Sequence, residues 1–480
     1  MKKMRGNAVI FAFLGILCLC LQGCLSPSYS RPALLEAMPE SYKEEGEWKT
    51  AVPGDSLDRG VWWERFHDPI LHELIAQATN ANQNIAIAAA NFRQARTQIA
   101  SARADFMPHI DGSGAGTRSG VESGRHTSRY TAGVSANWEL TLWNTLPVFE
   151  AARAQTEASA ADYSTMRLMV QSEVAQAYFQ LRALDEQLRL YEGTITAYAR
   201  AHTLTKNQYE GGMVTPADVA QAETQLASAQ AEMAAVERQR AEVEHSLAVL
   251  VGQLPTSFQL ARGTLLTSLP DIPLTVPSLL LERRPDIASA ERQVMVANEE
   301  IGIARAAWFP SISLGGNIGL ESSAWHGSPL EVWSVGPSLG LSIFQAGKKL
   351  AASDAAQARY EGAVASYRQT VLEAFKDVED NLSALRHMEN EAVAREKAVA
   401  SSATALRMVT AQYKAGMTNY LQVVTSQVTN LANERQAIQL QGQRLIASVT
   451  LIKALGGGWD SRSLAPMRRG ETLPTEGQLP

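Results

Sequence analysis

The chain contains one large unit twice. The stretch YEGGMVTPADVAQAE begins at Tyr209, and its counterpart YKAGMTNYLQVVTSQ begins at Tyr413, 204 residues later. An earlier pair, ARADFMPHI ending at Ile110 and ARAAWFPSI ending at Ile312, is offset by 202 residues. Because order and spacing are kept over so long a segment, the repeat is a duplication of a whole structural half and not a solenoid of short units.

This duplication divides the chain into five predicted parts. They are a signal peptide at 1–23, a lipidated N-terminal segment at 24–66, repeat 1 at 67–262, repeat 2 at 263–459 and a C-terminal tail at 460–480. Each repeat is expected to run helix, strand pair, long helix, tip, helix. The tail is rich in Gly, Pro and charge, and its sequence indicates no role.

Four stretches alternate between apolar residues and small or polar ones, and they are predicted to be strands. Their approximate ranges are 109–119, 127–142, 311–321 and 333–344. A period of two fits a membrane β-barrel strand and also a half-buried strand of a soluble sheet. Four such segments in two hairpins favour the barrel. Four strands cannot close a barrel, and an open edge in lipid leaves backbone groups unpaired, so the barrel must be shared between chains.

The remaining sequence predicts unusually long helices. No proline follows Pro147 until after Tyr209, so this segment could form a helix of roughly 90 Å. After Tyr413, apolar residues recur at alternating spacings of three and four, which is the seam of a coiled coil. The seam includes Leu421, Val424, Val428 and Leu431, and its counterpart in repeat 1 is nearly all alanine. Helices flanked on both sides can close into a tube, although a plain soluble bundle has the same pattern.

The N-terminus indicates export. Three basic residues precede a 14-residue apolar run, Ala8–Leu21, which is shorter than the ~20 residues of a membrane-spanning helix. The run ends in Leu-Gln-Gly-Cys24, which resembles a bacterial lipobox, so Cys24 is expected to be lipidated and to become the mature N-terminus. An ordinary secretory signal is the alternative. Leu25 stands where an Asp commonly retains lipoproteins in the inner membrane, so the outer membrane is predicted.

Composition and motifs argue against several other functions. Removing residues 1–23 leaves 40 Lys+Arg against 49 Asp+Glu, a net charge of −9 without a basic tract, which does not favour nucleic-acid binding. Residues 336–340 match G-x-S-x-G, but Ser338 lies in a predicted strand and not at the strand-to-helix elbow of a hydrolase. No His pair has zinc-helix spacing. We therefore expect no enzyme activity, catalytic residue, metal or cofactor.

Several segments together resemble the TolC-type outer membrane factors, especially the OprM-like lipoproteins of the NodT family. They are CLSPSYSRP at 24–32, LLLERRPDI at 279–287, ARAAWFPSISL at 304–314 and LIKALGGGW at 451–459. The resemblance covers nearly the whole mature chain. It implies a mixed α and transmembrane β fold: a homotrimer with four strands per chain in a 12-stranded barrel and a long periplasmic α-helical tunnel.

The same resemblance implies a function. The chain is expected to be the outer membrane channel of a tripartite efflux system, a passive exit duct for small molecules. Its partners would be a periplasmic adaptor protein and an inner-membrane pump, most often of the RND type. Type I secretion or heavy-metal efflux, and a non-channel structural lipoprotein built on coiled coils, are the alternatives.

The resemblance also assigns residues at the two repeated tips. The adaptor-docking turns are expected at Gly212, Met213 and Val214 and at Gly416, Met417 and Thr418. In relatives the closed aperture is held partly by a Tyr–Asp tie between hairpins, whose positions match Tyr413 and Asp218. Such a hydrogen bond is charge-assisted. This sequence has Thr418 where some relatives have an Arg, and Gln422 and Thr425 where some have acidic residues. A strongly cation-selective aperture is therefore not expected.

Overall fold

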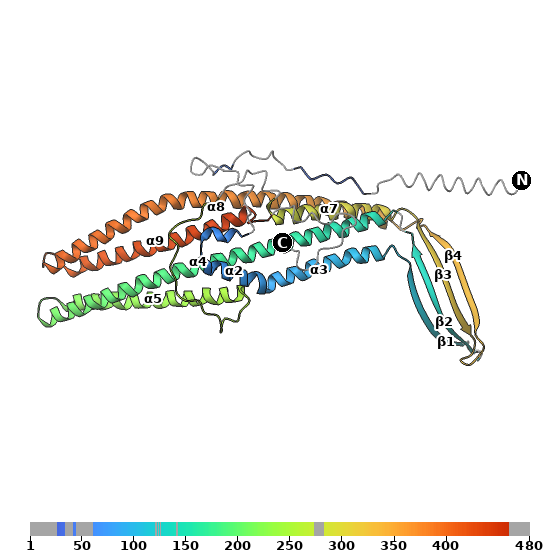
Figure 1. The fold of residues 1–480 in the computed structure, drawn as a ribbon, viewed down its shortest axis with the longest axis horizontal. Helices are drawn as coiled ribbons and strands as arrows, with labels where there is room; N and C mark the ends of the chain where they lie inside the picture. The colour runs from blue at the N-terminus through green and yellow to red at the C-terminus, as the bar shows by residue number, and fades with distance from the viewer. Residues whose placement is uncertain are drawn as a thin grey trace. The chain divides into compact units, whose positions relative to one another are not determined.

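The computed structural model describes residues 26–33, 42–44, 61–120, 122, 124, 126–140, 143–272 and 283–459 (Figure 1). The chain forms two compact units. One contains residues 1–35, 90–161 and 288–370, and the other contains residues 36–89, 162–287 and 371–480. Cys24, the expected signal peptide and the C-terminal tail lie outside the described residues. None of the described helices combines the length and the apolar composition that a membrane-spanning helix needs.

The two halves of the chain have corresponding elements. The first half contains η1 (Trp62–Phe66), α2 (Pro69–Ala81), α3 (Gln83–Ala104), β1 (His109–Gly120), β2 (His126–Glu139), α4 (Thr145–Glu210) and α5 (Pro216–Leu250). The second half contains α7 (Pro285–Ala306), β3 (Ser311–Ser322), β4 (Leu330–Gly340), α8 (Lys348–Lys414) and α9 (Tyr420–Ala454). In each half a strand pair lies between a shorter helix and a helix of more than 60 residues, since α4 has 66 residues and α8 has 67.

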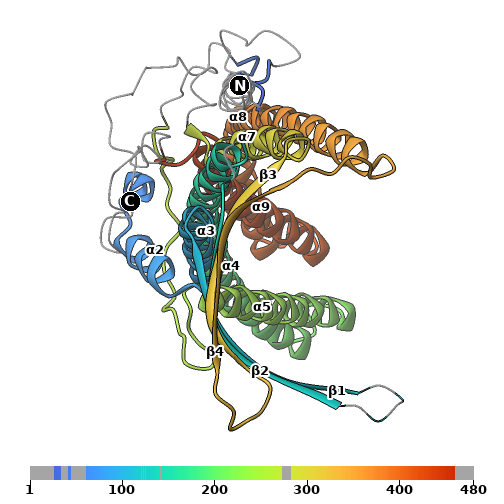
Figure 2. The same ribbon diagram turned by 90° about the vertical axis from the view of Figure 1, so that its right-hand side faces the viewer.

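The strands form one antiparallel sheet in the order β1-β2-β3-β4, which Figure 2 shows as a curved ribbon. The register brings apolar positions opposite one another: Val134 pairs with Ile318, and Ile318 pairs with Trp333. Because side chains alternate between faces, these residues share one face of the sheet. Ile318 and Trp333 are 60% and 74% exposed within the single chain. The sheet therefore presents an apolar face that the chain does not cover.

The fourth strand differs in extent from the alternating stretch at 333–344. It begins at Leu330 and ends at Gly340, where its pairing with Ser311 is the last rung of the β3–β4 ladder. The alternation continues through Leu341 and Ile343, but β3 offers no further partner there, and pairing rather than pattern decides where a strand ends. Ser338 lies within β4 and its Oγ is 2.6 Å from the Oγ of Ser313, so the G-x-S-x-G match is part of a strand.

The same joint connects helices in both repeats. Asn82 donates to the carbonyl oxygen of Leu250 at 2.8 Å, and 202 residues later Arg284 donates to that of Ala454 at 3.2 Å. A glycine with positive φ follows each of these helix ends, and the second is Gly456, at 90°. A Cβ at this position would collide with the carbonyl oxygen of Arg283. The close approach of backbone to backbone therefore requires glycine here.

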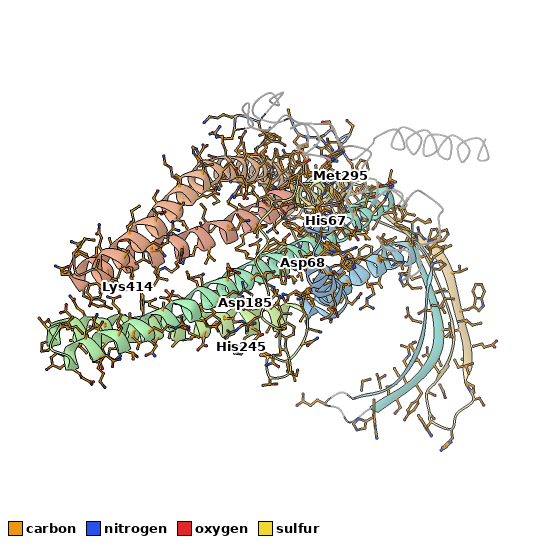
Figure 3. All side chains as sticks on the ribbon, turned by 60° about the vertical axis from the view of Figure 1, so that its left-hand side comes forward. His67, Asp68, Asp185, His245, Met295 and Lys414 are labelled. Atoms are coloured by element: carbon orange, nitrogen blue, oxygen red, sulfur yellow. The ribbon has the colours of Figure 1, made fainter. Side chains whose placement is uncertain are left out.

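A buried charge cluster joins α4, α5 and the segment that follows α5; we call it the clasp (Arg182, Asp185, Arg240 and residues 260–263). The Asp185 carboxylate accepts hydrogen bonds from Arg182 at 2.9 Å, from Arg240 at 2.6 Å and from the backbone N–H of Gly263 at 3.0 Å. The side chains of Arg182 and Asp185 are 2% and 0% exposed. Figure 3 shows Asp185 on α4. The clasp holds the linker between the repeats against the α4–α5 hairpin.

The chain segment closest to the N-terminus that is described packs along α7. Ser26 donates to the carboxylate of Glu299 at 2.7 Å, and Asn298 donates to the carbonyl oxygen of Pro27 at 2.9 Å. Arg31 makes two hydrogen bonds to the carboxylate of Glu291, at 3.0 and 2.7 Å. This bidentate, charge-assisted pair is the strongest type of side-chain contact available to an arginine. Residues 26–31 therefore have a defined position on α7.

Candidate functional site

The candidate site consists of the ends of the two helical hairpins, which we call tip 1 (residues 208–218, between α4 and α5) and tip 2 (residues 412–422, between α8 and α9). Figure 3 labels Lys414, the last residue of α8, in tip 2. All of these residues belong to the same compact unit. Their geometry can therefore be compared directly.

Both tips have the same turn. In tip 1 the N–H of Met213 donates to the Gln208 carbonyl oxygen and that of Gly212 donates to the Tyr209 carbonyl oxygen, both at 2.8 Å. Tip 2 has the two equivalent bonds at 2.9 and 3.0 Å. This pair of bonds is the Schellman motif, which places a left-handed residue after the helix. Gly212 and Gly416 have φ angles of 74° and 72°. The turn accounts fully for these two glycines, because only glycine adopts such angles without a steric cost.

The helices that leave the tips begin with side-chain caps. Thr215 caps α5 in a capping box, in which the Asp218 carboxylate accepts from the Thr215 N–H at 3.0 Å and from its hydroxyl at 2.8 Å. Asn419 caps α9 by accepting from the N–H of Gln422 at 3.2 Å. Asp218 and Gln422 are therefore equivalent third residues of their helices. A carboxylate at this position satisfies free N–H groups and interacts favourably with the helix dipole.

One apolar side chain projects from each tip. Met213 is 71% exposed and Met417 is 72% exposed, whereas their neighbours Val214 and Thr418 are partly buried. Methionine is flexible and polarizable, and it adapts its shape to a contacting surface. The two tips thus present the same kind of contact residue at equivalent positions.

The two hairpins are tied together near the tips. The Tyr413 hydroxyl donates a hydrogen bond to Oε1 of Gln208 at 3.0 Å, and the Tyr413 ring centroid lies 5.4 Å from that of Tyr420. Tyr420 is buried in a cluster with Ala222 of α5 and two valines of α9. Burial and, secondly, the negative charge of Asp218 raise the pKa of Tyr413. Both effects favour the neutral phenol, which is the form that can donate this bond.

The sequence-derived aperture residues are placed as follows. Asp218 lies near enough to Tyr413 to affect its pKa, but within this chain its carboxylate binds Thr215 while Tyr413 binds Gln208. The Tyr413–Asp218 tie therefore stays a prediction. Gln422 and Thr425 are exposed on the first turns of α9, and the Thr425 hydroxyl donates to its own helix at Leu421. With Thr418, they leave this part of α9 without an acidic residue.

Sequence reasoning missed Gln208. Its partner Tyr413 was assigned by resemblance, but glutamine at this position carries no motif of its own. A signal was nevertheless present, because the dipeptide Gln-Tyr occurs at 208–209 and again at 412–413, with the offset of the duplication. Repetition of a polar pair beside a turn is a reason to look for a shared contact.

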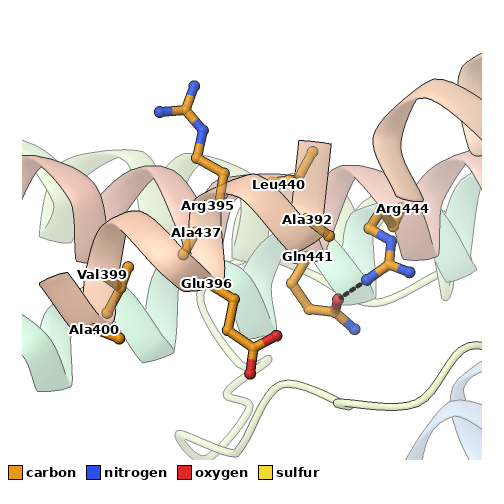
Figure 4. Close-up of a pocket in the computed structure, with 9 residues that line it drawn as sticks. All are labelled: Ala392, Arg395, Glu396, Val399, Ala400, Ala437, Leu440, Gln441 and Arg444. Atoms are coloured by element: carbon orange, nitrogen blue, oxygen red, sulfur yellow. Dashed lines mark hydrogen bonds between the residues drawn. The ribbon is translucent and has the colours of Figure 1, made fainter. Parts of the chain in front are cut away.

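A groove of about 410 Å³ lies between α8 and α9, farther from tip 2 (Figure 4). Val399, Leu440 and several alanines form its apolar part, and Arg395, Glu396 and Arg444 contribute charge. Arg444 donates to the Gln441 side chain at 3.1 Å, and Gln441 in turn donates to the carbonyl oxygen of Leu266 at 2.8 Å. The polar end of the groove is therefore already occupied by contacts within the chain.

The four-stranded sheet and the long helical hairpins define the class of protein as a TolC-like outer membrane channel. A solved structure of this class, the MtrE outer membrane channel of Neisseria gonorrhoeae in its open state, is 30% identical to the chain. It aligns over 91% of this chain and 98% of the other, with a TM-score of 0.76. Other solved channels of the same fold align with comparable coverage.

The family is equally clear. The sequence profile of the outer membrane efflux protein family matches residues 74–253 and 276–457, and the chain belongs to this family. Cation efflux system protein CusC of Escherichia coli O6:H1 is 30% identical over 451 residues, covering 92% of this chain and 97% of that protein. The probable efflux pump outer membrane protein TtgC of Pseudomonas putida is 34% identical over 470 residues, covering 93% and 95%.

Proposed function

We propose that this protein is the outer membrane channel of a tripartite efflux system and acts as a passive exit duct for small molecules. The observation that carries this proposal is a family match extending over both repeats, in a chain whose sheet has open edges at β1 and β4. Secretion of whole proteins and a purely structural coiled-coil role are less well supported, because the relatives that match along their full length are named for efflux.

The assembly that fits these edges is a homotrimer. An edge strand with unpaired N–H and C=O groups is costly in lipid, and pairing β4 of one copy with β1 of the next removes both edges. Three copies then form a closed barrel of twelve strands, and the uncovered apolar face that includes Ile318 and Trp333 faces lipid. The long helical hairpins line a tunnel in the periplasm.

The tips are the proposed docking site for a periplasmic adaptor protein. Met213 and Met417 are exposed at equivalent places, and Gly212, Val214, Gly416 and Thr418 shape the turns around them. The adaptor in turn connects the channel to an inner-membrane pump of the RND type. Energy and direction of transport come from that pump, and the channel supplies the path.

Cys24 is the proposed lipid anchor in the outer membrane. Its support is the sequence Leu-Gln-Gly-Cys at the end of a short apolar run. A single acyl group binds membranes only weakly, and here the barrel supplies the main attachment. The anchor therefore adds to an insertion that the barrel already provides.

The substrate is proposed to be a small toxic compound selected by the pump. CusC is named for cation efflux and TtgC for an efflux pump, so one channel architecture serves different cargoes. The α9 residues Gln422 and Thr425 add no acidic group at the proposed aperture. A neutral constriction passes solutes with little regard to charge, which suits a duct whose specificity lies elsewhere.

Reconstitution tests this proposal. The purified chain should have the mass of a trimer and should form conducting pores in a planar lipid bilayer. Restoring it to cells that contain the adaptor and pump but lack an outer membrane channel should lower the accumulation of a fluorescent efflux substrate. A trimer that forms no pore, or pores that leave accumulation unchanged with the matching adaptor and pump present, would contradict the proposal.

A further inference from the structure

The tie between the hairpins uses only half of what the duplication provides. Within the chain, Tyr413 of tip 2 donates to Gln208 of tip 1. The duplication places the same two residue types at the reciprocal positions, Tyr209 in tip 1 and Gln412 in tip 2. A second tie of the same kind therefore has both of its members present.

Both reciprocal residues are free within one chain. Tyr209 is 45% exposed and Gln412 is exposed. Among the described residues, neither the Tyr209 hydroxyl nor the Gln412 side-chain amide has a hydrogen-bond partner, whereas their equivalents Tyr413 and Gln208 bind each other. The backbones around them match, since both tips have the same Schellman turn. The free pair thus starts from the same local geometry as the bonded pair.

Symmetry brings the free pair together. This step rests on the homotrimer proposed above, in which tips 1 and 2 alternate around a ring. The rotation that carries tip 1 onto tip 2 carries Gln208 onto Gln412. It also carries Tyr413 onto Tyr209 of the next copy. A ring of identical subunits uses such head-to-tail contacts, in which each copy offers one surface to each neighbour.

We propose that Tyr209 donates a hydrogen bond to the partner subunit's Gln412. The ring of tips is then closed by alternating Tyr–Gln ties, one within each copy and one between adjacent copies. The proposal concerns neutral residues only. A tie between a phenol and an amide has no group that titrates near neutral pH, so it holds the tips independently of pH and is little affected by salt.

The two kinds of tie differ in their surroundings. Tyr413 stacks near Tyr420, and Tyr420 packs on Ala222. The duplication places Pro216 at the position equivalent to Tyr420, so the tie between copies lacks the aromatic cover. Water competes more effectively for an uncovered hydrogen bond, which lowers its net strength. The ties between copies are therefore the first to release when the tips separate.

Cysteine cross-linking of the full-length protein tests the tie. The natural cysteines are at positions 18, 20 and 24, so introduced thiols are the only ones beyond residue 24. The variant Tyr209→Cys with Gln412→Cys is treated with a short bifunctional thiol reagent and separated by denaturing electrophoresis without reductant. The matched control is Tyr413→Cys with Gln208→Cys, whose linkage lies within one chain.

The expected result is dimer and trimer bands for the first variant and a monomer band with an internal cross-link, identified by mass spectrometry, for the control. An intact trimer in which the control pair reacts and the first pair does not would overturn the proposed tie while leaving the channel function untouched. A monomeric wild-type protein would instead overturn the homotrimer. As a functional readout, Tyr209→Phe and Gln412→Leu should each raise single-channel conductance, and their combination should raise it no further.

Discussion

The Tyr413 hydroxyl and Oε1 of Gln208 are 3.0 Å apart, although the two residues are separated by 205 positions in the sequence. Their hydrogen bond joins the end of α8 to the end of α4. Any movement that separates the two hairpins at the tips must therefore break it. The tie is a neutral one, in contrast to the Tyr–Asp tie expected by resemblance.

Removing the Tyr413 hydroxyl should loosen the tips. Tyr413→Phe and Gln208→Leu are each expected to raise single-channel conductance and to cost about 1 kcal/mol of stability, the net value of one hydrogen bond. Because both variants break the same bond, the double variant should equal either single one. If Tyr413→Phe were instead coupled to Asp218→Asn and additive with Gln208→Leu, the tie would run to Asp218.

The clasp predicts a large stability effect at Asp185. Asp185→Ala leaves Arg182 buried without its carboxylate partner, and breaking a buried ion pair in this way costs about 3–5 kcal/mol. The matched control is Glu242→Ala, which breaks an exposed pair with Arg238 and should cost less than about 1 kcal/mol. Thermal unfolding of the solubilised protein, followed by circular dichroism, measures both. Equal midpoints for the two variants would contradict the assignment.

Two glycines with similar φ angles should respond differently to alanine. Gly416, at 72°, has open space around its missing side chain, so Gly416→Ala should cost only the left-handed conformation, about 1–2 kcal/mol. Gly456→Ala adds a collision with the Arg283 carbonyl oxygen and should cost more. Unfolding midpoints of the two variants give the comparison. A smaller loss at Gly456 than at Gly416 would show that this joint can relax.

Tyr178 predicts a loss of stability in strong alkali. Burial and the hydrogen bond that its hydroxyl donates to Asp68, at 2.6 Å, raise the pKa of Tyr178 to about 12. The folded chain binds this proton more tightly than the unfolded chain, whose tyrosines titrate near pH 10. The contribution is therefore complete below about pH 10 and is lost as pH rises through about 12.

The test compares the free energy of unfolding of the wild type and Tyr178→Phe across this range. The phenylalanine variant should be less sensitive to pH between about 10 and 12. Tyr360→Phe, at a residue with no role in this contact, is the control and should titrate like the wild type. Identical pH slopes for all three proteins would mean that Tyr178 ionises normally.

Sequence patterns predicted the TolC-like fold well because the fold follows from periodicity. Alternation over stretches such as 128–138 reflects one apolar face, and that face appears in the sheet register. The end of β4 could not be read in the same way. Leu341 and Ile343 continue the alternation, but the length of the partner strand β3 decides where pairing stops.

The partner of Tyr413 was not predictable from sequence for a different reason. Gln208 and Asp218 both lie close to tip 1, and a choice between them depends on which side chain is free. Asp218 is engaged by the cap of its own helix at Thr215, a competition that appears only in three dimensions. The clasp was missed for a similar reason, since Arg182 and Asp185 look like an ordinary surface pair three residues apart on a helix.

The contacts of Ser26 with Glu299 and of Arg31 with Glu291 have a consequence for insertion into the outer membrane. Cys24 is only two residues before Ser26, and two residues of extended chain reach about 7 Å. A lipid on Cys24 is therefore confined to a small volume near the end of α7, which leads into β3. The acyl chains proposed there would act as a depth marker, setting how far each subunit sinks before its strands pair with those of its neighbours.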